Sequence, residues 1–177
     1  IGVINNVDYQ SKTIYTDSLL LISLDTYLGT NHHLYEGIPQ YIRQEMDVNY
    51  LSSHVAEKFV EHKIPPTKDR SLLSQMIFHG KKIYLKDWVL PRLTNAQKMG
   101  YTDDQLQWVV DNEVYMWQYF VEKQLLFNTD TALLQRFIEP GPFSKFYLEI
   151  DNESPARIGV WLGWQIVRSY MQHNTVS

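Results

Sequence analysis

The segment NESPARIGVWLGWQIVRSYM, residues 152–171, constrains the fold more than any other part of the chain. If the segment forms a helix, apolar side chains lie on nearly every side of it, and such a helix is normally buried inside a domain. Ser154 and Pro155 are a favourable N-cap and first residue for it. Gly159 and Gly163 lie four residues apart on one face, where a neighbouring helix can approach closely. The segment therefore predicts a core helix that other helices cover.

Helical patterning extends over most of the chain after residue 35, because apolar residues recur at intervals of three and four. Gly80 lies in the middle of the longest stripe, where glycine costs about 1 kcal/mol relative to alanine and so indicates a close backbone crossing. Thr102 and Gln105 form a capping-box pattern at another helix start. The predicted helical segments are 38–46, 51–60, 69–90, 102–125 and 130–138.

The N-terminal part has the pattern of β-strands instead, at residues 1–5, 12–16 and 18–27, the last of which contains the run LLLISL. A chain of 177 residues is long enough to bury a core of its own and fits one domain, residues 1–177. The predicted fold class is therefore α+β and predominantly α-helical, with short N-terminal strands followed by a multi-helix domain.

Composition excludes several classes of function. Acidic and basic residues are mixed along the chain with a net charge of -4, so there is no basic stripe for nucleic acid. No run of 18 apolar residues predicts a membrane span. The absence of cysteine excludes a thiolate metal site and a cysteine nucleophile. An aromatic content of 14% indicates either a ring-rich core or a contact surface.

Histidines are the first candidates for chemistry, but none occurs in an HExxH zinc motif. His54 and His62 are eight residues apart, about 12 Å along a helix, which is too far to share one ion. We therefore expect both to be surface histidines. His79 directly precedes Gly80 and is expected near the core, more as a structural residue than as a ligand. No metal and no cofactor are predicted.

Glu113 lies within an apolar stripe, and a buried carboxylate is either paired or has a raised pKa suited to acid–base chemistry. Arg157 is its expected partner, and a structural ion pair is favoured over catalysis because no nucleophile or second carboxylate accompanies it. If the chain did bind a metal, the ligands would be His54, His79 and Glu113.

Four segments, in this order, resemble the gliding-motility lipoprotein family GldB. They are YLGTNHHLYEGIPQYIRQEM, LLSQMIFHGKKIYLKDWVLP, GYTDDQLQWVVDNEVYMWQYFVEKQLLFNTD and NESPARIGVWLGWQIVRSYM. The resemblance implies the C-terminal part of a longer cell-envelope lipoprotein, anchored by a lipid outside these residues and facing the periplasm. It also implies a partner protein in the envelope or in the gliding machinery and its coupled secretion system.

The family is itself similar to degenerate zinc peptidases, which places residues 51–62 at the zinc-motif helix and His79-Gly80 at a later Glu-Gly pair. Two ligands and the catalytic base are missing, so the likeness implies a zincin-like scaffold without the reaction. The expected cleft or binding residues are His79, Lys81, Glu113, Arg157, Trp161 and Gln165.

Three functions remain open at this point. The leading one is a non-catalytic domain that binds a partner protein through an aromatic-rich surface or the former cleft. The rival is a metal-dependent hydrolase that uses His54, His79 and Glu113. The third is a small-ligand binder in which Arg157 and Lys81 hold a carboxylate or glycan group.

Overall fold

The computed structural model describes residues 1–175, apart from the side chain of residue 150. The N-terminal part forms a three-stranded sheet with β3 (Leu20–Ser23) in the centre. β1 (Gly2–Val3) pairs parallel to it and β2 (Thr13–Tyr15) antiparallel, so that Gly2 and Thr13 both lie opposite Ile22. The three predicted strands are therefore confirmed, in shorter form.

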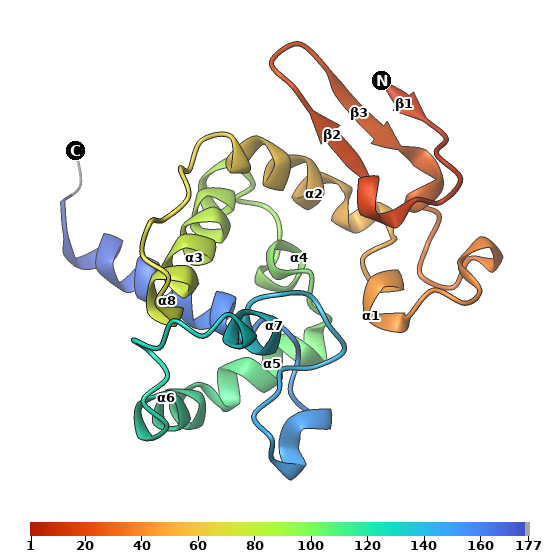
Figure 1. Ribbon diagram of the computed structural model, residues 1–177. Coiled ribbons are helices and arrows are strands. Elements are labelled where there is room, and N and C mark those ends of the chain that lie inside the picture. The colour runs from red at the N-terminus through yellow and green to blue at the C-terminus, as the bar shows by residue number, and fades with distance from the viewer. Residues whose placement is uncertain (176–177) are drawn as a thin grey trace.

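Helices make up about 54% of the structure, which confirms an α+β fold that is predominantly helical. The sheet lies next to α2 at one end of the molecule, and α6 lies at the other (Figure 1). No helix within residues 1–175 combines the length and the apolar character needed to cross a bilayer. The helices are α1 (Gln40–Arg43), α2 (Val48–Glu61), α3 (Leu72–Val89), α4 (Asn95–Met99), α5 (Asp103–Asp111), α6 (Glu113–Glu122), α7 (Ala132–Phe137) and α8 (Ile158–His173).

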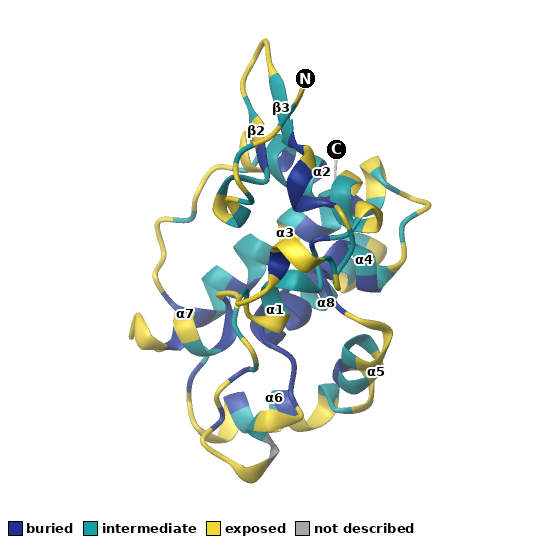
Figure 2. Ribbon diagram, turned by 90° about the vertical axis from the view of Figure 1, so that its right-hand side faces the viewer, coloured by how far each residue is buried: buried dark blue, intermediate teal, exposed yellow. Residues whose placement is uncertain are grey.

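The crossing of α3 and α8 forms the centre of the core and is the most extensive contact between two elements. Every residue of α8 from Ile158 to Trp164 is buried, which confirms the predicted core helix (Figure 2). A Cβ atom at Gly80 would clash with the backbone of Gly163, and one at Gly163 would clash with the backbone of Met76. The two helices therefore cross at backbone distance, as the glycines predict.

The predicted start of the core helix is wrong by three residues. The helix begins at Ile158, not at Pro155, and its N-cap is Arg157 in the left-handed conformation with φ 64°. The hydroxyl of Ser154 is buried and donates instead to two carbonyl oxygens of the preceding loop, the nearer being that of Asp151 at 2.9 Å. These bonds hold the hydroxyl against the preceding segment, and the N–H of Ile158 donates to the hydroxyl of Ser144 instead.

The predicted helix over residues 102–125 is two helices. Its start is confirmed, since Thr102 and Gln105 form a complete capping box. The break comes at Asn112, whose side-chain amide donates to the carbonyl oxygen of Trp108 at 2.9 Å. Such a local side-chain bond to the backbone competes with continuation of the helix and lets α6 leave at a different angle.

Candidate functional site

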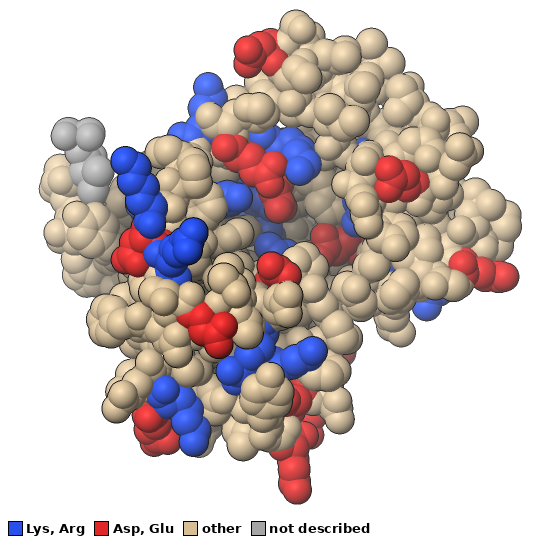
Figure 3. All heavy atoms as spheres, viewed as in Figure 1, with Lys and Arg blue, Asp and Glu red and all other residues tan. Residues whose placement is uncertain are grey.

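A cleft of about 460 Å³ lies between the sheet, α2, α3 and the residue that caps α8. Its lining contains four carboxylates and four cationic side chains, together with His54 and His79. Figure 3 shows a hollow on this face with acidic and basic side chains around it. Because both signs of charge are balanced, the cleft is suited to polar ligands and gives no field that attracts a polyanion.

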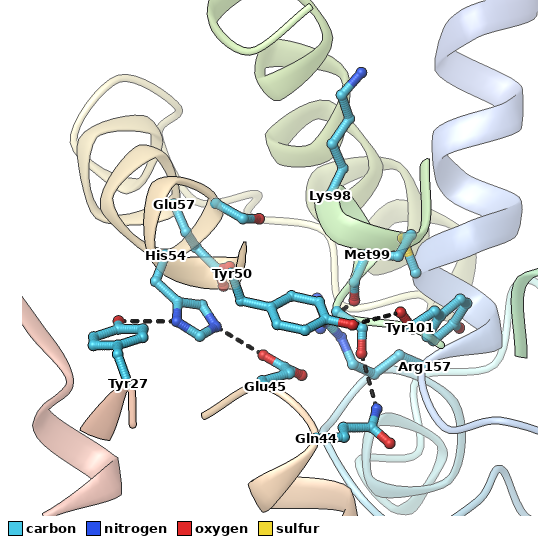
Figure 4. A network of polar contacts seen from close by, with 12 residues as sticks. Tyr27, Gln44, Glu45, Tyr50, His54, Glu57, Lys98, Met99, Tyr101 and Arg157 are labelled. Carbon is cyan, nitrogen blue, oxygen red and sulfur yellow. Dashed lines mark hydrogen bonds and ion pairs between the residues drawn. The ribbon is translucent and has the colours of Figure 1, made fainter. Parts of the chain in front are cut away.

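His54, on α2, is held on both sides of its ring. Its Nδ1 lies 3.0 Å from the hydroxyl of Tyr27, and its Nε2 lies 2.8 Å from a carboxylate oxygen of Glu45 (Figure 4). This geometry fits the neutral tautomer that accepts from Tyr27 and donates to Glu45. The side chain is only 13% exposed, so the prediction of a surface histidine is wrong for His54. Neither ring nitrogen is left to bind a metal or to accept a proton from a substrate.

Glu45, from the segment between α1 and α2, carries a stable negative charge. Burial raises its pKa, but the hydrogen bond from His54 and nearby positive charges outweigh that effect and keep the pKa below its ordinary value. Gly100, with φ 74°, ends α4 and leaves room for this carboxylate, because a Cβ atom there would collide with it. The glycine is therefore needed for its conformation and for its lack of a side chain.

Glu57, one helical turn after His54, is paired with the buried Lys86 of α3 at 2.9 Å. The ammonium group of Lys86 also donates to the hydroxyl of Ser53 and to the carbonyl oxygen of Lys98, so all three of its protons have acceptors. Burial raises the pKa of Glu57, but the charges of Lys86 and Arg157 more than offset this and hold the pKa well below its ordinary value. The carboxylate of Glu57 is therefore charged at neutral pH.

Arg157 reaches the cleft from the turn before α8. A left-handed conformation costs a non-glycine residue of order 1 kcal/mol, and such residues concentrate at functional sites. The guanidinium donates to the carbonyl oxygen of Met99 at 3.0 Å and has no carboxylate at ion-pair distance among the described residues. The expected ion pair with Glu113 is therefore not formed. Glu113 lies in the first turn of α6, where the helix dipole stabilises its charge without a cation.

His79 lines the cleft from α3, and no residue of the described chain hydrogen-bonds to its ring. Burial, with the charges of Lys82 and Arg157, lowers its pKa to about 4. The imidazole is therefore neutral at physiological pH. Its neighbour in the cleft is Lys82, whereas Lys81 is exposed and does not line the cleft, since one residue turns a helix by about 100°.

Trp161 and Gln165 lie in the core side of α8 and do not line the cleft. Trp161 is 3% exposed and makes an edge contact with Trp164 at 5.6 Å between ring centroids. The indole N–H of Trp161 and the side-chain amide nitrogen of Gln165 are buried without a hydrogen-bond partner in the described residues. Of the three expected cleft residues at or on α8, only Arg157 lines the cleft.

The conditional metal ligands do not come together. His54 and His79 share the cleft, but Glu113 is on α6, outside it. In the part of the chain that the structure describes, no three His, Asp or Glu side chains are grouped closely enough to hold an ion. The geometry can fix charges and bind polar groups, but it does not assemble a ligand set or an activated nucleophile.

Sequence reasoning missed Tyr27, Glu45 and Lys86, three of the residues that organise the cleft. The buried stripe of α3 runs through Met76 and Ile83, and Lys86 is the next position on that face. A lysine on the buried side of a helix predicts a carboxylate partner, so this signal was present in the sequence. Tyr27 and Glu45 gave no comparable signal, because their positions depend on loops.

Comparison with known proteins agrees with the resemblance read from the sequence. No curated protein and no solved structure matched the chain, so the likeness to a zincin-like scaffold stays a prediction. The family described as "Gliding motility protein GldB" matches residues 1–177, over the whole sequence. The chain therefore belongs to the GldB family.

Proposed function

We propose that this GldB-family chain is a non-catalytic, protein-binding domain of a lipid-anchored envelope protein that faces the periplasm. Its partner is a protein of the gliding machinery or of the secretion system coupled to it. The lipid anchor lies outside these residues. The single observation that carries the proposal is a group of exposed apolar side chains on and beside α6, the helix that lies at the end of the molecule opposite the sheet (Figure 1).

This α6 surface consists of the exposed apolar residues Val114, Tyr115, Val121, Phe127 and Leu148. Tyr115 is 67% exposed and Phe127 is 78% exposed. Apolar residues scattered singly over a surface need no explanation, but several that gather around one helix indicate a site of protein contact. Aromatic side chains in such patches supply a large share of binding energy.

Two apolar grooves flank α6 and give this surface its shape. One, of about 370 Å³, is lined by aromatic rings that include Trp108 and Tyr119. The other, of about 630 Å³, runs past Phe120 and Leu126. Grooves on both sides of an exposed helix can receive side chains of a partner, as the anchor residues of protein interfaces require.

The charges around the α6 surface favour a protein partner over a membrane. Helices α5 and α6 contain five acidic residues, Asp103, Asp104, Asp111, Glu113 and Glu122. The basic residues beside α6 are fewer: Lys123 follows it, and Arg136 donates to the hydroxyl of Tyr119 at 3.1 Å. An acidic rim is repelled by anionic lipid headgroups. It complements a partner whose apolar contact residues are surrounded by lysine and arginine.

The charged cleft supports the non-catalytic part of the proposal. Both nitrogens of His54 have partners, and Glu57 is paired with Lys86. Glu57 therefore serves as the counter-ion of Lys86, and burial raises the pKa of Tyr27, the hydroxyl beside His54, so that this hydroxyl is not an activated nucleophile. Of the two cleft histidines only His79 has an unoccupied ring, and one neutral imidazole is not a catalytic set.

The docking test uses a photo-crosslinking amino acid at position 121 or 115 of the full-length protein, in cells that glide. We expect one and the same identified envelope protein to be crosslinked from both positions. Crosslinking from Asp17, at the exposed tip between β2 and β3, should not capture it. Equal capture from all three positions, or none from the α6 surface, would overturn docking at α6.

A matched pair of variants connects this contact with function. Val121→Glu places a charge on the α6 surface, and Val48→Glu places one on an equally exposed valine at the start of α2. We expect Val121→Glu to abolish the crosslink from position 115 and to reduce colony spreading, and Val48→Glu to leave both intact. An equal loss of colony spreading in both variants would show that the added charge does not act by blocking docking at the α6 surface.

The non-catalytic part is tested separately by elemental analysis of protein purified without chelator, together with zinc titration by calorimetry. We expect no stoichiometric metal and no binding heat. Stoichiometric zinc bound with sub-micromolar affinity would overturn this part of the proposal, and it would leave the docking result unaffected.

A further inference from the structure

A second pocket, of about 670 Å³, lies between α1, the start of α2, α4 and the start of α5. It is separate from the α6 surface, and its chemistry differs from that of the charged cleft. Fourteen residues line it, and only Arg43, Asp47 and Asp103 among them are charged. Its volume lies within the range of sites for small ligands, roughly 300 to 1,000 Å³.

The wall of this pocket is made chiefly of side-chain amides and hydroxyls. The amides of Asn31, Gln40 and Asn49 and the hydroxyl of Thr30 line it, and none of them hydrogen-bonds to another described residue. A carboxamide offers both donors and an acceptor on one rigid plane. That combination matches a ligand hydroxyl, which both donates and accepts.

Arg43 adds a donor that lacks an acceptor. Its Nε is buried and has no hydrogen-bond partner in the part of the chain that the structure describes. Buried donors in folded proteins are nearly always paired, and an unpaired one indicates a missing water, ion or ligand. Arg43 also lines the pocket, so the other nitrogens of its guanidinium can donate to an oxygen atom of a ligand there.

Tyr50 supplies an aromatic surface that is fixed in place. Its hydroxyl donates to the carbonyl oxygen of Tyr101 at 2.9 Å (Figure 4). The hydroxyl of Tyr101 in turn donates to the carbonyl oxygen of Ala156. A ring held at its polar end presents an apolar face at little cost in conformational entropy. The pocket therefore combines many neutral hydrogen-bonding groups with one rigid ring.

We propose that this pocket binds an uncharged oligosaccharide, whose hydroxyl or acetamido groups meet the amides and Arg43 and whose apolar ring face lies on Tyr50. A peptide fits the pocket less well, because the walls offer no sheet edge and, apart from the tyrosines, only Ala96 as an apolar residue. A polyanion fits less well too, because two carboxylates face a single cation.

The test uses the 177-residue chain, labelled with ¹⁵N, and two neutral probes, chitotriose and cellotriose. We expect saturable amide shifts confined to the segments that line the pocket, around residues 30–31, 43–50, 94–97 and 101–103. Binding of chitotriose alone assigns the site to glycans with acetamido groups, and binding of both probes assigns it to neutral glycans in general. No saturable binding of either probe, or shifts centred elsewhere, overturns the proposal.

Two variants and one control tie the binding to the pocket wall. Asn49→Ala removes an exposed amide with no partner, and Gln97→Glu keeps the capping box of α4 while it replaces an amide with a charge. Each should weaken binding about fivefold to tenfold, the effect of one lost hydrogen bond. Gln118→Ala, an exposed amide on α6, should bind like the wild type. Equal affinity in all variants would contradict the assignment, and crosslinking at α6 is unaffected either way.

Discussion

The α3–α8 crossing and the charged cleft are neighbouring regions that are held together in different ways. The crossing is apolar, and its geometry depends on glycines at which the backbones touch. The cleft depends on ionised side chains from the sheet, α2, α3 and the cap of α8, held by ion pairs such as Glu57 with Lys86. Substitutions in the first region should therefore act through volume at any pH, and those in the second should act through charge and change with pH.

The largest effect on the free energy of unfolding is expected from Gly163→Ala. The added Cβ atom would collide with the backbone of Met76, which is part of a helix and cannot move away on its own. Overpacking of a core commonly costs 1 to 3 kcal/mol, and a clash with backbone belongs at or above the upper end, so we expect a loss of about 3 kcal/mol or more. Urea denaturation followed by circular dichroism measures the change.

Gly141→Ala is the matched control, because its new Cβ atom would meet only ordinary contact at 3.8 Å. It should change the free energy of unfolding by less than about 0.5 kcal/mol. Equal losses in the two variants would mean that glycine flexibility, and not the close crossing, governs stability.

Glycine spacing explains why the crossing could be predicted from the sequence. Gly80, Gly159 and Gly163 interrupt apolar stripes, and a glycine in that position has few reasons to occur other than close packing. The capping box at Thr102 correctly predicts the start of α5. Thr94 and Gln97 form the same box at α4, so that helix too had a signal in the sequence.

The second largest effect on the free energy of unfolding is expected from Lys86→Met. It removes the buried partner of Glu57 and leaves the hydroxyl of Ser53 and the carbonyl of Lys98 without their donor. Loss of one partner from a buried pair costs about 3 to 5 kcal/mol, and because the Glu57 side chain is 34% exposed, we expect about 2 to 3 kcal/mol. The double variant with Glu57→Gln should recover part of the loss, since it also removes the unpaired charge.

The pH dependence of this pair follows from the lowered pKa of Glu57. A carboxylate whose pKa is lower in the folded state contributes stability that is fully present above its ordinary pKa of 4.5 and is lost as the pH falls through the folded value. The wild type should therefore lose more stability below pH 4.5 than Lys86→Met does. Parallel curves of unfolding free energy against pH would show that Lys86 does not hold the charge of Glu57.

The cleft could be predicted only in part, because its residues come from segments far apart in the sequence. His79 and Arg157 were singled out by their places beside Gly80 and at the start of the core helix, and both line the cleft. The expected pairing of Arg157 with Glu113 failed because no sequence pattern fixes the position of α6 relative to α8. Tyr27 and Glu45 reach His54 through the loops that connect the sheet to α2, and loop paths cannot be derived from periodicity.

The smallest effect on the free energy of unfolding at neutral pH is expected from His79→Gln. Its dependence on pH distinguishes the charged cleft from the α3–α8 crossing. Because the pKa of His79 falls from its ordinary 6.5 to about 4 in the folded protein, the unfolded chain takes up the proton first. The wild type should therefore lose stability as the pH falls from 6.5 towards 4, and the variant should lose less over that interval.

NMR titration of the ring protons should give a midpoint near pH 4. A midpoint near 6.5 would mean that Lys82, Arg157 and burial do not act on this ring. Since the stabilising contribution of Glu57 changes only below about pH 4.5, a difference between wild type and variant at pH 5 to 6 reports on the cleft at His79, whereas the penalty of Gly163→Ala should stay the same throughout.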